Sequence, residues 1–151
     1  MTSLVRRFLR TAVAFLAFGL ALGVWMIGRR ELLGEAPSAY LVSAHTHAIL
    51  VGFVMMMILG VALWMFPRAK KGGPRYRPAL AEVAYWLVAV GTGVRVVAEL
   101  ARTSSAAIAL RWVVVLAGTA QAVGLVLFFF TMWPRIRAVG SATREAAGER
   151  F

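Results

Sequence analysis

His45 and His47 are the only imidazole groups in the 151-residue chain. They lie two residues apart in an apolar stretch, SAHTHAILVGF, where an ionisable side chain is by default a candidate functional residue. The spacing sets them about 160° apart around a helix, so a single helix cannot present both to one metal ion. Either histidine is a candidate ligand. The alternative is that both are bonded to backbone or water at a membrane boundary.

A second group of ionisable residues follows in a later apolar stretch and just beyond it. Arg95 and Glu99 are spaced i, i+4, so they share one helix face and can form an ion pair within the helix. Arg102 and Arg111 add two more cations. The guanidinium groups suit a ligand with carboxylates, which arginine binds bidentately. The alternatives are a purely structural ion pair and, for Arg111, a side chain that reaches back to the membrane surface.

Four apolar segments hold these residues, at about 11–28, 40–66, 81–101 and 106–133. Each is close to or above the roughly 20 residues that a helix needs to cross a bilayer. Because backbone groups in lipid must be satisfied within the segment, the sequence predicts an all-α, four-transmembrane-helix antiparallel bundle. The first segment could instead be a signal peptide, but no small-residue cleavage site precedes Arg29, so we expect a retained helix.

The basic residues predict how these helices are oriented. Twelve of the seventeen basic residues lie in the N-terminal segment, in the loop between the second and third helices, and in the tail 134–151: Arg6, Arg7, Arg10, Arg68, Lys70, Lys71, Arg75, Arg77, Arg135, Arg137, Arg144 and Arg150. The positive-inside rule places both termini and this loop in the cytoplasm. We therefore expect a multi-pass protein of a bacterial-type inner membrane, with lipid rather than nucleic acid as the partner of the net charge of +11.

This topology brings the ionisable residues into one extracytoplasmic layer, formed by His45, His47, Arg95, Glu99, Arg102 and Arg111. The cytoplasmic half holds almost no polar group apart from Gln121, near the middle of the membrane. A layer with histidine and several arginines fits haem, which needs an axial nitrogen on its iron and cations for its propionates. Because the chain has no cysteine, any haem must be haem b held without a covalent bond.

Glycines follow the histidines on the same helix face, with Gly52 and Gly60 lying seven and fifteen residues after His45. They allow a haem to approach the backbone closely, and equally they allow two transmembrane helices to pack closely. The run Met55–Met57 offers axial or copper ligands, with apolar filling as the alternative.

The stretch with His45-Thr46-His47, Gly52, Gly60 and Pro67 resembles the haem-ligating helix of subunit I of the haem–copper oxidase superfamily. The nitric oxide reductases and cbb-type oxidases are the most similar branches. The stretch is still more similar to small four-helix membrane proteins that are oxidase subunit-I-like. The resemblance implies that His45 binds low-spin haem b, with His47 as the second candidate. It covers about 25 residues, one helix of four.

The chain departs from that family after this helix. A complete subunit I has about twelve helices and later histidines, whereas no histidine follows His47 here. The chain therefore cannot build a binuclear haem–copper centre alone, and we do not expect an enzyme. The second axial ligand would be His47, a methionine, a histidine from a second copy, water or an open position.

The sequence thus predicts a b-type haem protein for electron transfer or binding of a gas such as NO or O₂. We expect a homo-oligomer or an association with a respiratory complex. The propionates would contact Arg95, Arg102 and Arg111, Glu99 would orient one of these arginines, and Gly52 would allow close approach. One alternative is a haem-free accessory or assembly subunit, and a weaker one is a copper-binding membrane protein.

Overall fold

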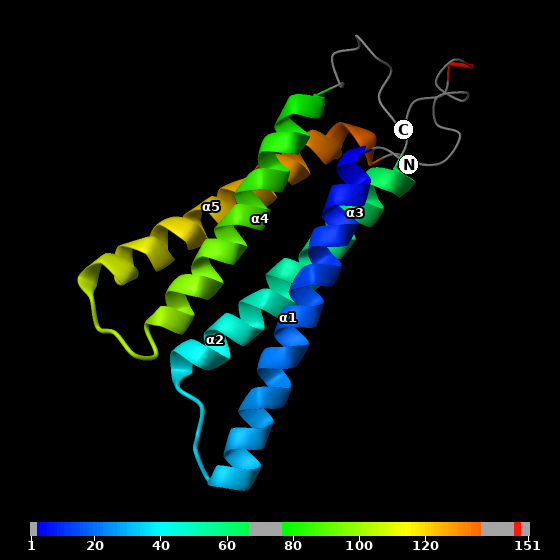
Figure 1. Ribbon diagram of the computed structural model, residues 1–151. Coiled ribbons are helices and arrows are strands. Elements are labelled where there is room, and N and C mark those ends of the chain that lie inside the picture. The colour runs from blue at the N-terminus through cyan, green and yellow to red at the C-terminus, as the bar shows by residue number, and fades with distance from the viewer. Residues whose placement is uncertain (1–2, 67–76, 137–146, 149–151) are drawn as a thin grey trace.

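A computed structural model describes residues 3–66, 77–136 and 147–148 of the chain. Every regular element in these ranges is a helix: α1 (Ser3–Leu33), α2 (Ala39–His47), the π-helix η1 (Ala48–Met55), α3 (Met56–Met65), α4 (Pro78–Ala101), α5 (Ile108–Met132) and the short 3₁₀ helix η2 (Trp133–Arg135). The elements α2, η1 and α3 follow one another without a break and form one long rod, drawn in cyan to green in Figure 1.

Consecutive long helices run in opposite directions (Figure 1). Helix α1 packs along η1 and α3, α4 packs along α5, and α2 and η1 contact α4. Ion pairing of Arg7 with Glu82 and hydrogen bonds from Arg135 to the carbonyls of Leu63 and Phe66 join the helix ends at one side of the molecule. The rod α2–η1–α3 therefore contacts both α1 and α4, and α1 also touches the α4–α5 hairpin through Phe8.

Four helices in the described residues are long and apolar enough to cross a membrane: Ser3–Leu33, Ala39–Met65, Pro78–Ala101 and Ile108–Arg135. Large apolar side chains remain exposed on every one of them, such as Val24, Met65, Val97 and Val126. Helices that are apolar on their outward faces as well as inside are typical of membrane spans. The all-helical membrane fold predicted from the sequence is confirmed to this extent.

The helix ends follow local chemistry. Helix α1 continues to Leu33, beyond the predicted end near residue 28, and stops where Gly34 takes a φ of 68°. A positive φ costs glycine little, which makes it a common residue just after a helix. Ser38 then caps α2, since its hydroxyl oxygen accepts a hydrogen bond from the Leu41 amide at 3.3 Å. Pro78 begins α4.

The main apolar core lies in the half of the molecule that contains the start of α1. Phe8 is fully buried there, with its ring edge-on to Tyr85 at 5.0 Å and to Phe128 at 5.8 Å between centroids. Met56 and Val88 belong to the same cluster. Met56 is therefore apolar core, which is the alternative that the sequence left open for the Met55–Met57 run. A smaller cluster forms nearer the other end around Ala44, Ala48 and Val96.

Seven of the basic residues used for orientation lie outside the described residues: Arg68, Lys70, Lys71, Arg75, Arg137, Arg144 and Arg150. So does most of the predicted tail 134–151.

Candidate functional site

The two histidines face opposite neighbours, as their spacing predicts. His45 lies against α1, and His47 lies against α4. Both are half-buried. They therefore belong to two separate environments, and no single ion can bind both within one chain.

His45 is fixed by the glycine face of α1. Its Nδ1 lies 3.0 Å from the carbonyl oxygen of Gly19, and because a carbonyl can only accept, Nδ1 carries the proton. The ring also lies over Gly23, where a Cβ would come within 2.9 Å of Cε1. Gly23 therefore makes room for the imidazole and Gly19 supplies the carbonyl that holds it, a pairing that was not predicted from the sequence.

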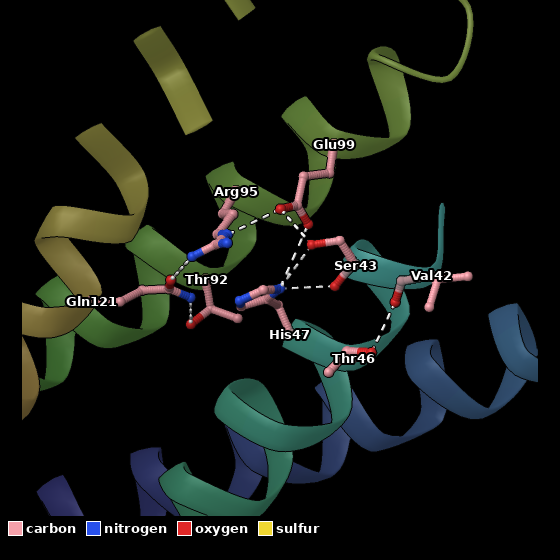
Figure 2. A network of polar contacts seen from close by, with 8 residues as sticks. All are labelled: Val42, Ser43, Thr46, His47, Thr92, Arg95, Glu99 and Gln121. Carbon is pink, nitrogen blue, oxygen red and sulfur yellow. Dashed lines mark hydrogen bonds and ion pairs between the residues drawn. The ribbon is translucent and has the colours of Figure 1, made fainter. Parts of the chain in front are cut away.

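His47 is fixed in the same way on the other face. Its Nδ1 lies 2.8 Å from the carbonyl oxygen of Ser43, one turn earlier in α2, and 3.7 Å from Oε2 of Glu99 in α4. In Figure 2 these contacts leave from one ring nitrogen. For both histidines Nε2 has no hydrogen-bond partner in the part of the chain that the structure describes.

Glu99 is the centre of a polar network at the α2–α4 contact (Figure 2). Glu99 is only 2% exposed. Oε1 accepts hydrogen bonds from the Ser43 hydroxyl at 2.8 Å and from Nε of Arg95 at 3.0 Å. Oε2 is buried and has no hydrogen bond to the described residues. The Arg95–Glu99 ion pair predicted from the i, i+4 spacing is therefore present within α4, and Ser43 connects it to α2.

The network continues into α5. Nη1 of Arg95 lies 3.3 Å from Oε1 of Gln121, whose amide nitrogen donates to Oγ1 of Thr92 at 2.9 Å. Thr92 donates to the carbonyl of Val88 at 2.6 Å. Gln121 and Thr92 are both buried, so their polar atoms require such partners. This network, made of Ser43, His47, Thr92, Arg95, Glu99 and Gln121, is called the outer polar network below.

The structure places the remaining predicted site residues outside the outer polar network. Arg102 donates to the Tyr40 hydroxyl at 2.6 Å and lies 4.1 Å from the centre of that ring. Arg111 is exposed in the first turn of α5 and makes no polar contact with the described residues. Gly52 faces α1, where a Cβ would come within 2.4 Å of the Phe15 ring. In this structure Gly52 thus serves close helix packing.

Ser43 and Thr92 were not among the site residues predicted from the sequence. A usable signal existed for both, because Ser43 precedes His47 by four residues and Thr92 precedes Arg95 by three, so each shares a helix face with a predicted residue. Gln121 was noted only as a polar residue at mid-membrane depth. Serine and threonine hydroxyls often bond to the backbone of their own helix, so their position in the sequence is weak evidence for a role in a site.

The side chains of this region suit haem better than a metal ion that is held by three or more protein ligands. Within the described ranges no three or more His, Asp or Glu side chains are grouped as a metal cage would require. Haem needs only one or two axial ligands from the protein. An imidazole whose Nδ1 donates to a backbone carbonyl leaves a lone pair on Nε2, which is the usual arrangement of a metal-bound histidine.

Comparison of the chain with protein-family models, with curated proteins and with solved structures finds no match. Its function is therefore inferred from its own residues.

Proposed function

We propose that the protein is an integral membrane protein that binds haem b without a covalent bond and serves electron transfer or the binding of a gas such as NO or O₂. The carrying observation is that each histidine of α2 is anchored through Nδ1 to a backbone carbonyl, at Gly19 and at Ser43. This hydrogen bond fixes the tautomer and the ring plane before any ligand binds, and it leaves Nε2 available to coordinate iron.

The two histidines differ in what surrounds them. His45 is the ligand that the resemblance implies. His47 has the stronger polar surroundings, since Glu99 lies 3.7 Å from its Nδ1 and Arg95 bonds to Glu99. A carboxylate behind a ligating imidazole raises its basicity, and an arginine beside it can pair with a propionate. We keep His45 as the first candidate and His47 as the second, and the experiment below separates them.

When bound, haem would supply one-electron redox chemistry or a gas-binding iron. The chain's own residues would hold and orient the haem. The described residues include no histidine beyond these two, so a second axial histidine would come from another copy of the chain. This supports a homo-oligomer, and association with a respiratory complex is the other arrangement we propose. We do not propose an enzyme, since the histidines of a haem–copper centre are missing.

We further propose an antiparallel bundle in a bacterial-type inner membrane with both termini in the cytoplasm. The distribution of Lys and Arg supports this orientation. It places the outer polar network in the extracytoplasmic half and the Phe8 core in the cytoplasmic half.

One observation favours a haem-free accessory or assembly subunit as the second candidate. Most polar atoms of the outer polar network already have partners, so Arg95 and Glu99 can act as a structural joint between helices without any cofactor. Copper is not proposed, because the two histidines face different helices.

An absorption measurement tests the proposal. The protein is purified from haem-replete cells as wild type and as His45→Ala, His47→Ala and Thr46→Ala. Thr46 lies between the histidines and bonds only to the Val42 carbonyl, so it is the matched control. We expect a Soret band in the wild type and in Thr46→Ala, and its loss in His45→Ala.

A band lost only in His47→Ala would move the ligand to the second candidate. A colourless wild-type protein that is folded and inserted would overturn haem binding and favour the accessory subunit.

A further inference from the structure

A cavity lies at the opposite end of the molecule from the Phe8 core, where α1 ends and α2 begins. Its volume is about 500 Å³, within the range of ligand pockets. Its walls come from three separate parts of the chain, namely the end of α1, the segment 35–38 with the start of α2, and the end of α4. Figure 1 shows the start of α2 and the end of α4 at the same end of the molecule, with α1 continuing past them before the chain turns back into α2.

The cavity has an apolar interior and a charged rim. Leu22, Met26, Leu41 and Leu100 supply the apolar walls. The rim carries Arg29 and Glu35, which form an ion pair with each other. Each of these two side chains is close to half exposed, so the pair meets solvent.

Little free energy is needed to break the Arg29–Glu35 ion pair at the rim. An exposed ion pair contributes little to stability, so a ligand that replaces both halves of the pair loses little. Trp25 lies beneath the Arg29 guanidinium, with 5.0 Å from Cζ to the ring centre, and also lines the cavity. Its ring face can hold a second cation in the same way.

We propose that this cavity binds a phospholipid whose head group carries both a phosphate and a primary ammonium, the phosphatidylethanolamine class. Arg29 would hold the phosphate, Glu35 would accept hydrogen bonds from the ammonium, and the leucine walls would cover the first part of an acyl chain. A purely anionic head group would use Arg29 alone and would leave Glu35 in repulsive proximity to its charge. The site does not depend on haem, so its test and that of the proposed function can fail separately.

Native mass spectrometry of the detergent-solubilised protein tests the site, with phosphatidylethanolamine and phosphatidylglycerol added at equal concentrations. We expect phosphatidylethanolamine to be retained about fivefold or more over phosphatidylglycerol. Glu35→Gln should abolish this preference, and Arg29→Gln should weaken retention of both lipids. Circular dichroism checks that the variants keep their helix content.

The chain supplies a control in the neighbouring pair Arg30–Glu31, which has the same charges at 2.8 Å, is more exposed and does not line the cavity. Arg30→Gln and Glu31→Gln should retain the wild-type preference. Equal retention of the two lipids by the wild type, or equal effects of the two variant pairs, would overturn the proposal. So would tight binding of water-soluble glycerophosphoethanolamine, because the apolar walls would then contribute nothing.

Discussion

At the scale of single residues, the α2–α4 contact depends on one buried carboxylate. Glu99 bonds to Ser43 and Arg95 and lies next to His47, so it joins side chains from two helices. In an apolar interior a charge is tolerated only with such partners. Glu99 is therefore the residue whose loss should affect the molecule most.

Glu99→Gln should destabilise the protein by about 2 kcal/mol, because it leaves the Arg95 guanidinium without a countercharge inside the membrane span. Thermal unfolding in detergent, followed by circular dichroism, measures the change.

The double variant Arg95→Gln, Glu99→Gln provides the control through a double-mutant cycle. It should cost less than the sum of the two single variants, because the isolated charge is gone. Strict additivity would show that the two side chains do not interact.

Part of this site could be predicted from the sequence. The i, i+4 spacing predicts the Arg95–Glu99 pair, and the i, i+2 spacing predicts that His45 and His47 diverge. Partners on other helices could not be predicted, since they depend on how far one helix is rotated and shifted against another. For this reason the hydrogen bond from Arg102 to Tyr40 was not predicted, while the proposed propionate contacts of Arg102 and Arg111 stay predictions.

At the scale of helices, the contact between α1 and the α2–η1–α3 rod depends on glycines paired with large side chains. Gly52 receives the ring of Phe15, and Gly23 receives the imidazole of His45. Glycine lets transmembrane helices approach closely and pack by van der Waals contact, which replaces the hydrophobic effect inside lipid.

Gly52→Ala should destabilise the protein by about 1–3 kcal/mol, because its Cβ would overlap the Phe15 ring. Gly28→Ala is the matched control in α1, since a Cβ there meets nothing within 4 Å. That variant should be neutral or stabilising by about 0.5–1 kcal/mol through better helix propensity. Chemical or thermal unfolding in the same detergent compares the two. Equal effects would contradict the packing role of Gly52.

The presence of four long helices could be predicted from the sequence better than their ends or their local geometry. The four apolar runs predict four spans because a segment that crosses lipid must be apolar. The ends of an apolar run mark the ends of the hydrocarbon layer, and a helix can continue beyond them. Helix α1 therefore begins at Ser3 and continues to Leu33, past the predicted 11–28. The π-helix η1 was not predicted. Its composition is ordinary for a membrane span, and π-turns reflect packing around them.

At the scale of the whole molecule, polar and apolar interiors occupy different halves. The aromatic core around Phe8 fills the half near the start of α1, and the outer polar network fills the other half. On α4 the two regions adjoin at Val88, which belongs to the aromatic core and whose carbonyl accepts a hydrogen bond from Thr92 of the outer polar network.

Single cysteines test the proposed orientation cleanly, because the chain has none of its own. Ser105→Cys, in the α4–α5 connection, should react with a membrane-impermeant maleimide in intact cells. Ala79→Cys, at the start of α4, should react only after the membrane is opened. The reverse pattern would place the outer polar network on the cytoplasmic side.

The arrangement of charge also has a consequence for biosynthesis. Helix α4 is the least hydropathic of the four spans and carries Arg95 and Glu99, each of which opposes entry into lipid by about 2.5–3.5 kcal/mol when alone. Ribosomes make α1 and the α2–η1–α3 rod first, and these spans need no charged partner to insert. When α4 leaves the ribosome, the Ser43 hydroxyl is already in the membrane to receive Glu99. We therefore expect α4 to insert less readily when the first hairpin is absent, because Glu99 then lacks its Ser43 partner.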